Sequence, residues 1–314
     1  MSRVAIRPAV LRWLLDGDPA IRWQVMRDLA DEPARAVAAE RARVASEGWG
    51  ATLLARQNPD GSWGDPGSPR RWEPTLFTML LLREFGIDPD SSPARAAAKR
   101  LGERFTWGPE FGDSPFFEGE VEPCINGHTL ALGAYFGVPS ERLMKRLLSE
   151  QLDDGGWNCE AERGSVRSSF HTTLCVLEGL LAYEHARGAT PALTKARRLG
   201  EEYLLRRDLM RRLSTGRVID QQWTRFAFPT TWHYDVLRGL DYFRRAGGAP
   251  DKRLGEAVEV VRTRRHQNER WPLGTVHADP VDLAMEAGKG HASRWITLRA
   301  LRVLDWFAST GGRA

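Results

Sequence analysis

Apolar and polar segments of helical length alternate along this chain of 314 residues. The apolar segments, which carry few charges, cover residues 74–85, 123–137, 168–184, 230–245 and 293–308. The segments that alternate with them carry charge on one face and cover residues 34–56, 93–105, 140–152, 191–207 and 252–266. A helix that is apolar all round is buried, whereas an amphipathic helix lies at the surface. The alternation therefore predicts an inner ring of helices surrounded by an outer ring.

The spacing of the apolar segments predicts repeated helical hairpins. They begin about 47 residues apart in the first part of the chain and about 62 residues apart later, where longer loops cover 207–229 and 267–292. No long run alternates between apolar and polar residues as a half-buried strand does, and no linker divides the sequence. We expect one all-α domain over 1–314, built from about five to six hairpins. Residues 1–33 would form a short N-terminal helical extension of it.

One loop is used twice in the sequence. It reads Gln-Asn-Pro-Asp-Gly-Ser-Trp over 57–63 and Gln-Leu-Asp-Asp-Gly-Gly-Trp over 151–157. Glutamine and tryptophan are six residues apart in both copies, and helical patterns precede and follow each copy. A degenerate third copy over 267–271, Gln-Asn-Glu-Arg-Trp, lacks the glycine. A repeated loop between helical patterns predicts stacked helical hairpins.

Composition and charge exclude several classes of protein. The net charge is only +4, and acidic residues are mixed with arginine throughout, so no nucleic-acid-binding surface is expected. No apolar run is long enough for a signal peptide or a membrane span. Three cysteines in a chain of this length do not make a disulfide framework. We therefore expect a reduced, cytoplasmic protein in which a cysteine near a turn is a candidate ligand.

The Gln-x-x-Asp-Gly-x-Trp loop resembles the QW motif of the squalene cyclase and prenyltransferase repeat superfamily. The resemblance covers most of the chain from about residue 35 onward and implies an α/α toroid. One branch of that superfamily, the class II terpene cyclases, protonates an alkene with an Asp-x-Asp-Asp motif. This sequence contains no such motif, and a turn role accounts for Asp153-Asp154 inside the repeated loop. We therefore do not expect a class II cyclase.

Two helix starts resemble the zinc site of the β subunits of protein prenyltransferases. In those enzymes a Val-Asp-x-Cys run opens one inner helix and a Tyr-His-Thr run opens the next, and Asp, Cys and His hold the zinc. Here Val-Glu-Pro-Cys covers 121–124, and Phe-His-Thr covers 170–172. The resemblance implies Zn²⁺ ligation by Cys124 and His171, with Glu122 in place of the aspartate and one methylene longer.

The residue types support a zinc site independently of the resemblance. Zinc takes thiolate, imidazole and carboxylate ligands in a tetrahedral shell, and a catalytic site keeps one position open. Cys124 and His171 are 47 residues apart, which is one repeat unit, so they are expected at the same end of adjacent inner helices. Cys159 lies between them in the sequence, just after the second tryptophan loop. As a fourth ligand, Cys159 would close the shell and make the site structural.

Other candidate residues lie at the starts of the predicted inner helices. His233 and Asp235 would form an acid–base pair near the metal. Trp72, Trp232 and Trp295 would either line a central cavity or pack in the core. An aromatic wall suits an isoprenoid chain, because the rings give apolar area and stabilise a developing positive charge.

Together these features predict a prenyltransferase- or terpene-cyclase-like enzyme. It would bind a small, apolar, isoprenoid-like substrate in a central cavity, with a zinc ion at one end of that cavity. The alternative is a non-catalytic α/α toroid that binds a ligand or another protein, with any zinc purely structural, because a fold alone does not fix chemistry. The sequence leaves the substrate, the reaction and the oligomeric state open.

Overall fold

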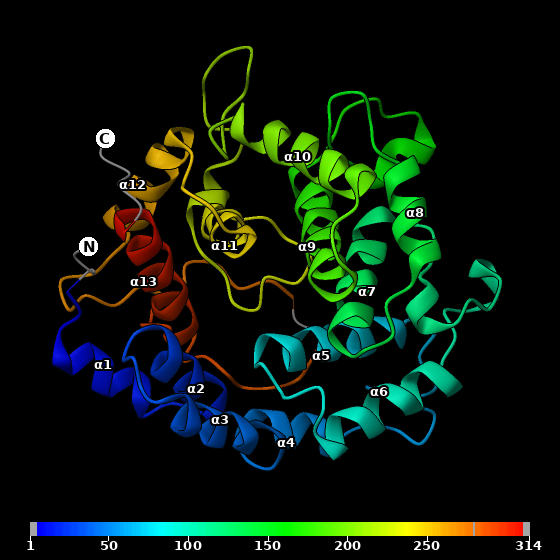
Figure 1. Cartoon of the computed structure of the whole chain (residues 1–314), viewed down its shortest axis with the longest axis horizontal. Coiled ribbons are helices and arrows are strands. Elements are labelled where there is room, and N and C mark those ends of the chain that lie inside the picture. Colours follow the sequence, from blue (N-terminus) through cyan, green and yellow to red (C-terminus); the bar gives the residue numbers. More distant parts are fainter. Residues whose placement is uncertain (1–4, 279, 310–314) are drawn as a thin grey trace. The chain divides into compact units, whose positions relative to one another are not determined.

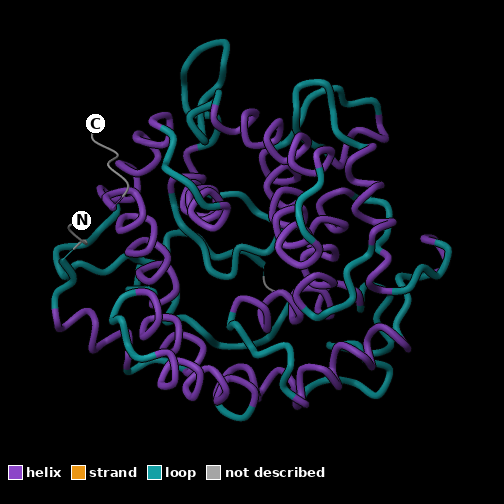
Figure 2. The backbone as a smooth tube through the Cα atoms, in the orientation of Figure 1, coloured by secondary structure: helices purple, strands orange, loops and turns teal. Residues whose placement is uncertain are grey.

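The computed structural model describes residues 5–278 and 280–309. Over these residues every regular element is a helix, and no strand is present (Figure 1 and Figure 2). The predicted all-α class is therefore confirmed. Residues 1–4 of the expected N-terminal extension lie outside the described part of the chain. None of the described helices is long and apolar enough to cross a membrane.

Contacts between Cα atoms divide the chain into two compact units. Unit 1 contains Met1–Arg41, Leu204–Asp279 and Leu283–Ala314, and unit 2 contains Ala42–Tyr203 and Pro280–Asp282. Each unit has helices and buried apolar side chains of its own. The expected single domain, and the closure of its helices into one ring, stay predictions.

Unit 2 is built from apolar helices packed against amphipathic ones. Its α-helices are α4 (Gly48–Ala55), α5 (Trp72–Glu84), α6 (Ser92–Arg104), α7 (Pro123–Tyr135), α8 (Glu141–Ser149), α9 (Phe170–Arg187) and most of α10 (Pro191–Leu205). The apolar helices α7 and α9 lie side by side, in green in Figure 1, and α5 packs against α7. The amphipathic helix α8 buries Leu143, Met144 and Leu147 and leaves its charged face exposed. Apolar helices are thus buried and amphipathic helices lie at the surface of this unit.

Two glycines allow α7 and α9 to approach closely. A Cβ atom added to Gly127 on α7 would lie 2.5 Å from the carbonyl oxygen of Cys175 on α9. A Cβ atom added to Gly179 on α9 would lie 2.4 Å from the carbonyl oxygen of Gly127. Real Cβ atoms essentially never come within 3.0 Å of another atom in this way. No larger residue therefore fits at either position unless the two helices separate.

Unit 1 combines helices from both ends of the sequence. Its α-helices are α1 (Pro8–Leu15), α2 (Pro19–Asp28), most of α3 (Ala34–Ala42), α11 (Val236–Ala246), α12 (Gly255–Thr263) and α13 (Arg294–Ser309). Helix α13 packs against α2, α11 and α12. Arg302 on α13 donates a 2.8 Å hydrogen bond to Gln24 Oε1 on α2 and forms an ion pair with Asp28. Packing and charge together therefore hold α2 against α13.

Three loops repeat the same pair of tryptophan hydrogen bonds. In each loop the indole Nε1–H donates to a carbonyl oxygen ten residues earlier, and the main-chain N–H donates to a threonine hydroxyl on the next apolar helix. The three sets are Trp63 with Leu53 and Thr75, Trp157 with Leu147 and Thr173, and Trp271 with Val261 and Thr297, at 2.7 Å to each carbonyl and 3.0 Å to each hydroxyl. All three tryptophans are buried. Each loop thus ties the end of one helix to the start of another.

The third loop has a different register from the one read in the sequence. In the first two copies, the glutamine six residues before the tryptophan donates to two carbonyl oxygens. The residue six positions before Trp271 is Arg265, whose guanidinium lies 5.9 Å from the centre of the Trp271 ring. Glu269 adopts the left-handed conformation, with φ of 60°, that a glycine adopts in the other two copies. The counterpart of the glutamine is therefore Arg265 and not Gln267.

Candidate metal centre

Two segments of unit 2 bring three of the predicted ligands together. Helix α7 begins with a proline, so Cys124 lies in its first turn and Glu122 directly precedes the helix. Cys159 is the first residue of a short 3-10 helix, Cys159–Arg163, that follows the second tryptophan loop. The side chain of Asn158 accepts a hydrogen bond that caps this short helix, and so fixes where Cys159 begins it.

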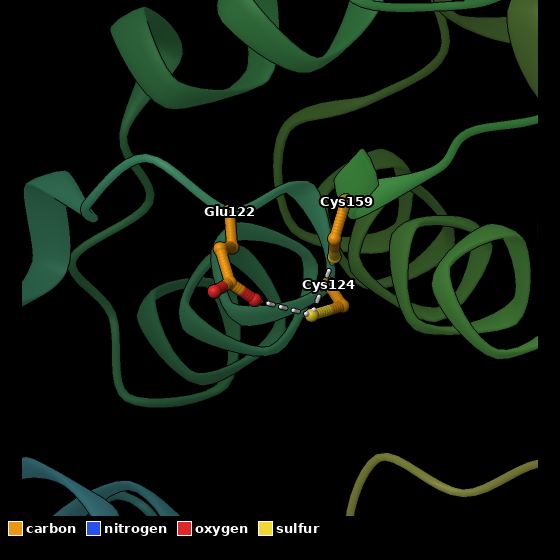
Figure 3. A group of neighbouring side chains, drawn as sticks. All are labelled: Glu122, Cys124 and Cys159. Carbon is orange, nitrogen blue, oxygen red and sulfur yellow. Dashed lines mark hydrogen bonds between the residues drawn. The ribbon is translucent and has the colours of Figure 1, made fainter. Parts of the chain in front are cut away.

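Glu122, Cys124 and Cys159 form a compact group of donor atoms (Figure 3). One carboxylate oxygen and the two sulfur atoms all lie within 4.8 Å of one another. The sulfurs of Cys124 and Cys159 are 2.9 Å apart, and Cys124 Sγ is 3.6 Å from Glu122 Oε2. The Thr172 hydroxyl is 3.4 Å from Cys159 Sγ. Both cysteines are half-buried, and Glu122 is exposed, so the group is open to solvent on one side.

The hydrogen bond between the two thiols shifts their pKa values in opposite directions. This contact lowers the pKa of the Cys159 thiol and raises the pKa of the Cys124 thiol. One sulfur of the pair therefore carries negative charge more readily than an isolated cysteine. A metal ion binds thiolates and releases their protons, so such a pair is prepared to exchange a shared proton for a cation.

One separation within the group matches that around a tetrahedral zinc ion, and another is shorter. Zinc–sulfur bonds of about 2.3 Å and zinc–oxygen bonds of about 2.1 Å place two sulfurs about 3.8 Å apart and a sulfur and an oxygen about 3.6 Å apart. The 3.6 Å contact between Cys124 and Glu122 already has this separation. The two sulfurs would need to separate by about 0.9 Å, which a small side-chain rotation supplies.

A buried polar network holds the main chain that carries Glu122. The carboxylate of Glu120, which is 4% exposed, accepts hydrogen bonds from the main-chain N–H of Glu122 at 2.7 Å and from that of Val121. Asn126 accepts from the N–H of Glu120 at 2.8 Å and donates to its carbonyl oxygen at 3.0 Å. Arg146 donates to the carbonyl oxygens of Glu120 and Val121. Burial raises the pKa of Glu120 to about 7.

Glu120 and Asn126 belong to no motif of the sequence. The available signal was the position of Asn126, a polar residue inside an otherwise apolar helical segment. Buried polar side chains in such segments are hydrogen-bonded, and Asn126 is fully buried. Its partners, however, lie in the preceding loop and follow from no sequence pattern.

His171 does not join the group of donors. It is the second residue of α9 and is half-buried. The next residue, Thr172, is the one whose hydroxyl reaches Cys159. His171 is not among the residues whose donor atoms lie within 4.8 Å of one another, and its ligation of a metal ion stays a prediction.

A second contact between cysteine and histidine lies deeper between α7 and α9. Cys175 Sγ is 3.3 Å from His128 Nε2, and both side chains are buried. Among the described residues, no third metal-binding side chain completes a group with them. Cys175 is therefore a core residue of unit 2.

In unit 1, the two residues of the expected acid–base pair have different surroundings: Asp235 caps a helix, and His233 stacks on an aromatic ring. Asp235 caps α11, because Oδ1 accepts from the N–H of Arg238 at 2.8 Å and Oδ2 accepts from the N–H of Ala227 at 3.0 Å. Burial raises the pKa of Asp235. His233 Nδ1 instead lies 2.9 Å from the Thr231 hydroxyl. Both carboxylate oxygens of Asp235 accept from main-chain N–H groups, so the geometry gives it a capping role, and the acid–base pair stays a prediction.

The three tryptophans expected along a cavity have different surroundings. Trp295 is 1% exposed and stacks on Phe228, with 4.4 Å between ring centres, so it is a core residue of unit 1. Trp72, in unit 2, is half-buried. Trp232 is 44% exposed and stacks on His233 with 3.8 Å between ring centres. Of these three, Trp232 presents the largest aromatic surface to solvent.

A pocket of about 500 Å³ in unit 2 adjoins the loop that carries Glu122. It shares Glu120 and Val121 with that loop. Four acidic residues and two arginines line it, namely Glu110, Asp113, Glu118, Glu120, Arg142 and Arg146. This pocket therefore offers charged groups to a ligand beside apolar lining residues such as Phe111 and Leu143.

No family model and no curated protein matches the sequence. The chain is similar to solved structures of the type II terpene cyclase MstE from Scytonema. The apo enzyme matches with a TM-score of 0.47 and 18% sequence identity, over 94% of this chain and 88% of that chain. A variant of MstE in complex with its substrate, geranylgeranyl dihydroxybenzoate, matches with a TM-score of 0.45 and 18% identity over the same shares of the two chains.

Proposed function

We propose that this chain binds a zinc ion through Glu122, Cys124 and Cys159 and acts as a metal-dependent enzyme on an isoprenoid-like, apolar substrate. The observation that carries the proposal is the convergence of two sulfurs and a carboxylate oxygen within 4.8 Å. Thiolate and carboxylate are both ligands that zinc takes. The separation of Cys124 Sγ from Glu122 Oε2, 3.6 Å, is that of two ligands in a tetrahedral shell.

Three protein donors favour an open site over a closed, structural one. Structural zinc sites have four protein ligands, whereas catalytic sites have three and leave one position for water or substrate. The described residues add no fourth member to the group, and its glutamate lies on the exposed side. When bound, the metal would supply Lewis acidity at that position. Glu120 and Asn126 hold the main chain at Glu122 in place.

The substrate class is proposed from the aromatic residues and the sequence. Trp232, His233 and His277 form one stack, with 3.6 Å between the two imidazole centres, and its outer ring is exposed. Aromatic faces bind apolar chains and stabilise positive charge. The sequence lacks the Asp-x-Asp-Asp motif, so we propose a zinc-assisted transfer and not an alkene protonation by that motif.

Metal analysis of the full-length chain tests the zinc site. We expect about one zinc ion per chain after dialysis, and loss of the metal in Cys124→Ser and in Cys159→Ser. Cys175→Ser is the matched control, because Cys175 contacts His128 and lies outside the group. Cobalt in place of zinc should give a thiolate charge-transfer band that each of the first two variants weakens. Less than about 0.2 zinc ion per wild-type chain, without that band, would refute the site.

Calorimetric titration with farnesyl diphosphate and geranylgeraniol tests the substrate class. Binding by the zinc-loaded chain that weakens in Trp232→Ala would support an isoprenoid substrate. The alternative is a non-catalytic protein with a structural zinc. It would be shown by zinc that raises the unfolding temperature while neither isoprenoid binds.

A further inference from the structure

The two sulfurs of the candidate metal centre are close enough to react with each other. Cys124 Sγ and Cys159 Sγ are 2.9 Å apart, and all three cysteines of the chain are free thiols. We propose that Cys124 and Cys159 are a modification site for hydroperoxides, which convert the dithiol into a reversible disulfide. The disulfide itself depends only on the two thiols; its effect on metal binding rests on the proposed function.

The geometry requires only a small movement. A disulfide bond is about 2.05 Å long, so the sulfurs must approach by about 0.9 Å. Cys124 lies in the first turn of α7, which Gly127 holds tightly against α9. Cys159 begins a five-residue 3-10 helix that ends at Gly164, where φ is 89°, and most of this helix is half-buried or exposed. The segment with Cys159 is therefore the one that moves.

The chemistry balances with a hydroperoxide as the oxidant. One thiolate attacks the peroxide oxygen, the O–O bond breaks, and an alcohol or water leaves while the sulfur becomes a sulfenic acid. The second thiolate attacks that sulfur, the S–O bond breaks, and water leaves as the disulfide forms. Two electrons pass from the two thiols to the peroxide. A dithiol reductant reverses the change by exchange through a mixed disulfide.

The third cysteine provides an internal control. Cys175 is 0% exposed, and its sulfur is 3.3 Å from His128 Nε2. Oxidation follows the access of the oxidant to the sulfur. Cys175 should therefore remain a thiol under conditions that oxidise the other two cysteines.

Oxidation would also control the metal centre. The thiolate is the form of cysteine that binds a metal, and a disulfide sulfur is not a thiolate. Once the bond forms, Glu122 is the one member of the group left with its charge. The same two residues would therefore hold either a metal ion or a covalent bond between themselves.

The experiment starts with the full-length chain freed of metal by a chelator, so that disulfide formation is measured independently of zinc. The chain is treated with hydrogen peroxide, quenched, denatured and alkylated with iodoacetamide, and then analysed by intact mass and peptide mapping. We expect a loss of about 2 Da before alkylation, a cross-linked peptide pair carrying Cys124 and Cys159, and alkylation of Cys175 alone. Dithiothreitol should restore three alkylated thiols.

Matched variants decide the assignment. Cys175→Ser should form the same cross-link, whereas Cys124→Ser and Cys159→Ser should form no intramolecular disulfide. Circular dichroism checks that each variant is folded. Three alkylated thiols after peroxide, or cross-links that involve Cys175, would overturn the proposal. A chromogenic chelator measures zinc release on peroxide treatment, which tests separately whether the disulfide prevents metal binding. A disulfide in a chain that never bound zinc would support the dithiol site and refute the metal centre.

Discussion

Replacing Gly179 by alanine should separate α7 from α9 and destabilise unit 2. The added Cβ would lie 2.4 Å from the carbonyl oxygen of Gly127, whereas ordinary contacts begin at 3.4 Å. The helices must therefore move apart by about 1 Å at the crossing. A gap of that size forfeits about a quarter to a half of the dispersion energy of the contacts along it.

The expected change in the free energy of unfolding of Gly179→Ala follows from two opposing effects. Inserting a methyl group into a packed core costs about 1–3 kcal/mol, and the upper end applies here because the obstacle is main chain and not a flexible side chain. Alanine has a helix propensity about 1 kcal/mol more favourable than that of glycine. The expected net loss is about 2 kcal/mol of the free energy of unfolding, which lowers Tm by about 4–8 °C.

Thermal unfolding followed by circular dichroism at the helical band measures this change. Gly255→Ala is the matched control, because a Cβ at Gly255 meets nothing within 4 Å and its φ is −56°. That variant should keep or slightly raise Tm. A Tm of Gly179→Ala within about 1 °C of the wild-type value would show that α7 and α9 do not cross as closely as described.

Three further changes test other parts of the structure. Asn126→Ala removes the hydrogen bonds that hold the loop with Glu122 and should weaken the affinity of the chain for cobalt by about 10–100-fold. An unchanged affinity in a cobalt titration would show that Asn126 does not position Glu122. Trp157→Phe keeps a buried aromatic ring, but it removes the indole N–H that donates to a carbonyl of α8 and leaves a small cavity. It should lower the free energy of unfolding, measured with denaturant, by at least about 1–3 kcal/mol. A loss below about 0.5 kcal/mol would count against the shared loop contact. Burial raises the pKa of Glu286 from 4.5 to about 7. The folded state therefore favours the protonated form of this carboxyl group. Its contribution to the free energy of unfolding falls as pH rises from about 4.5 to about 7. Glu286→Gln should flatten that part of the profile of Tm against pH, and an unchanged slope would refute the assignment.

Local sequence signals located the helices well, except where the main chain turns unexpectedly. The apolar segment predicted over 293–308 is α13, Arg294–Ser309. The segment predicted over 34–56 breaks before α4, where Gly48 has φ of 63°. The segment predicted from 230 begins only at Val236, because Thr231 has φ of 48° and Asp235 caps the helix. Apolar composition alone does not show where such a loop ends.

The candidate site was partly predictable for a similar reason. The resemblance to a prenyltransferase zinc site indicated Cys124 and Glu122 as ligands, and residue type and loop position added Cys159; the structure brings these three together. The same reasoning placed His171 beside them and joined Asp235 to a catalytic pair. His171 lies at the expected helix start but outside the group of donors, and the carboxylate of Asp235 accepts from two main-chain N–H groups.

The sequence by itself determined that this chain is helical and which helices are apolar, because helical periodicity and glycine stops act over a few residues. Only the tertiary structure decided which donors meet. Cys159 lies 35 positions after Cys124 in the sequence and reaches it in the fold, and the hydroxyl of Thr172 on α9 contacts the Cys159 sulfur. A contact between distant segments depends on how whole helices pack, and local preferences do not encode it.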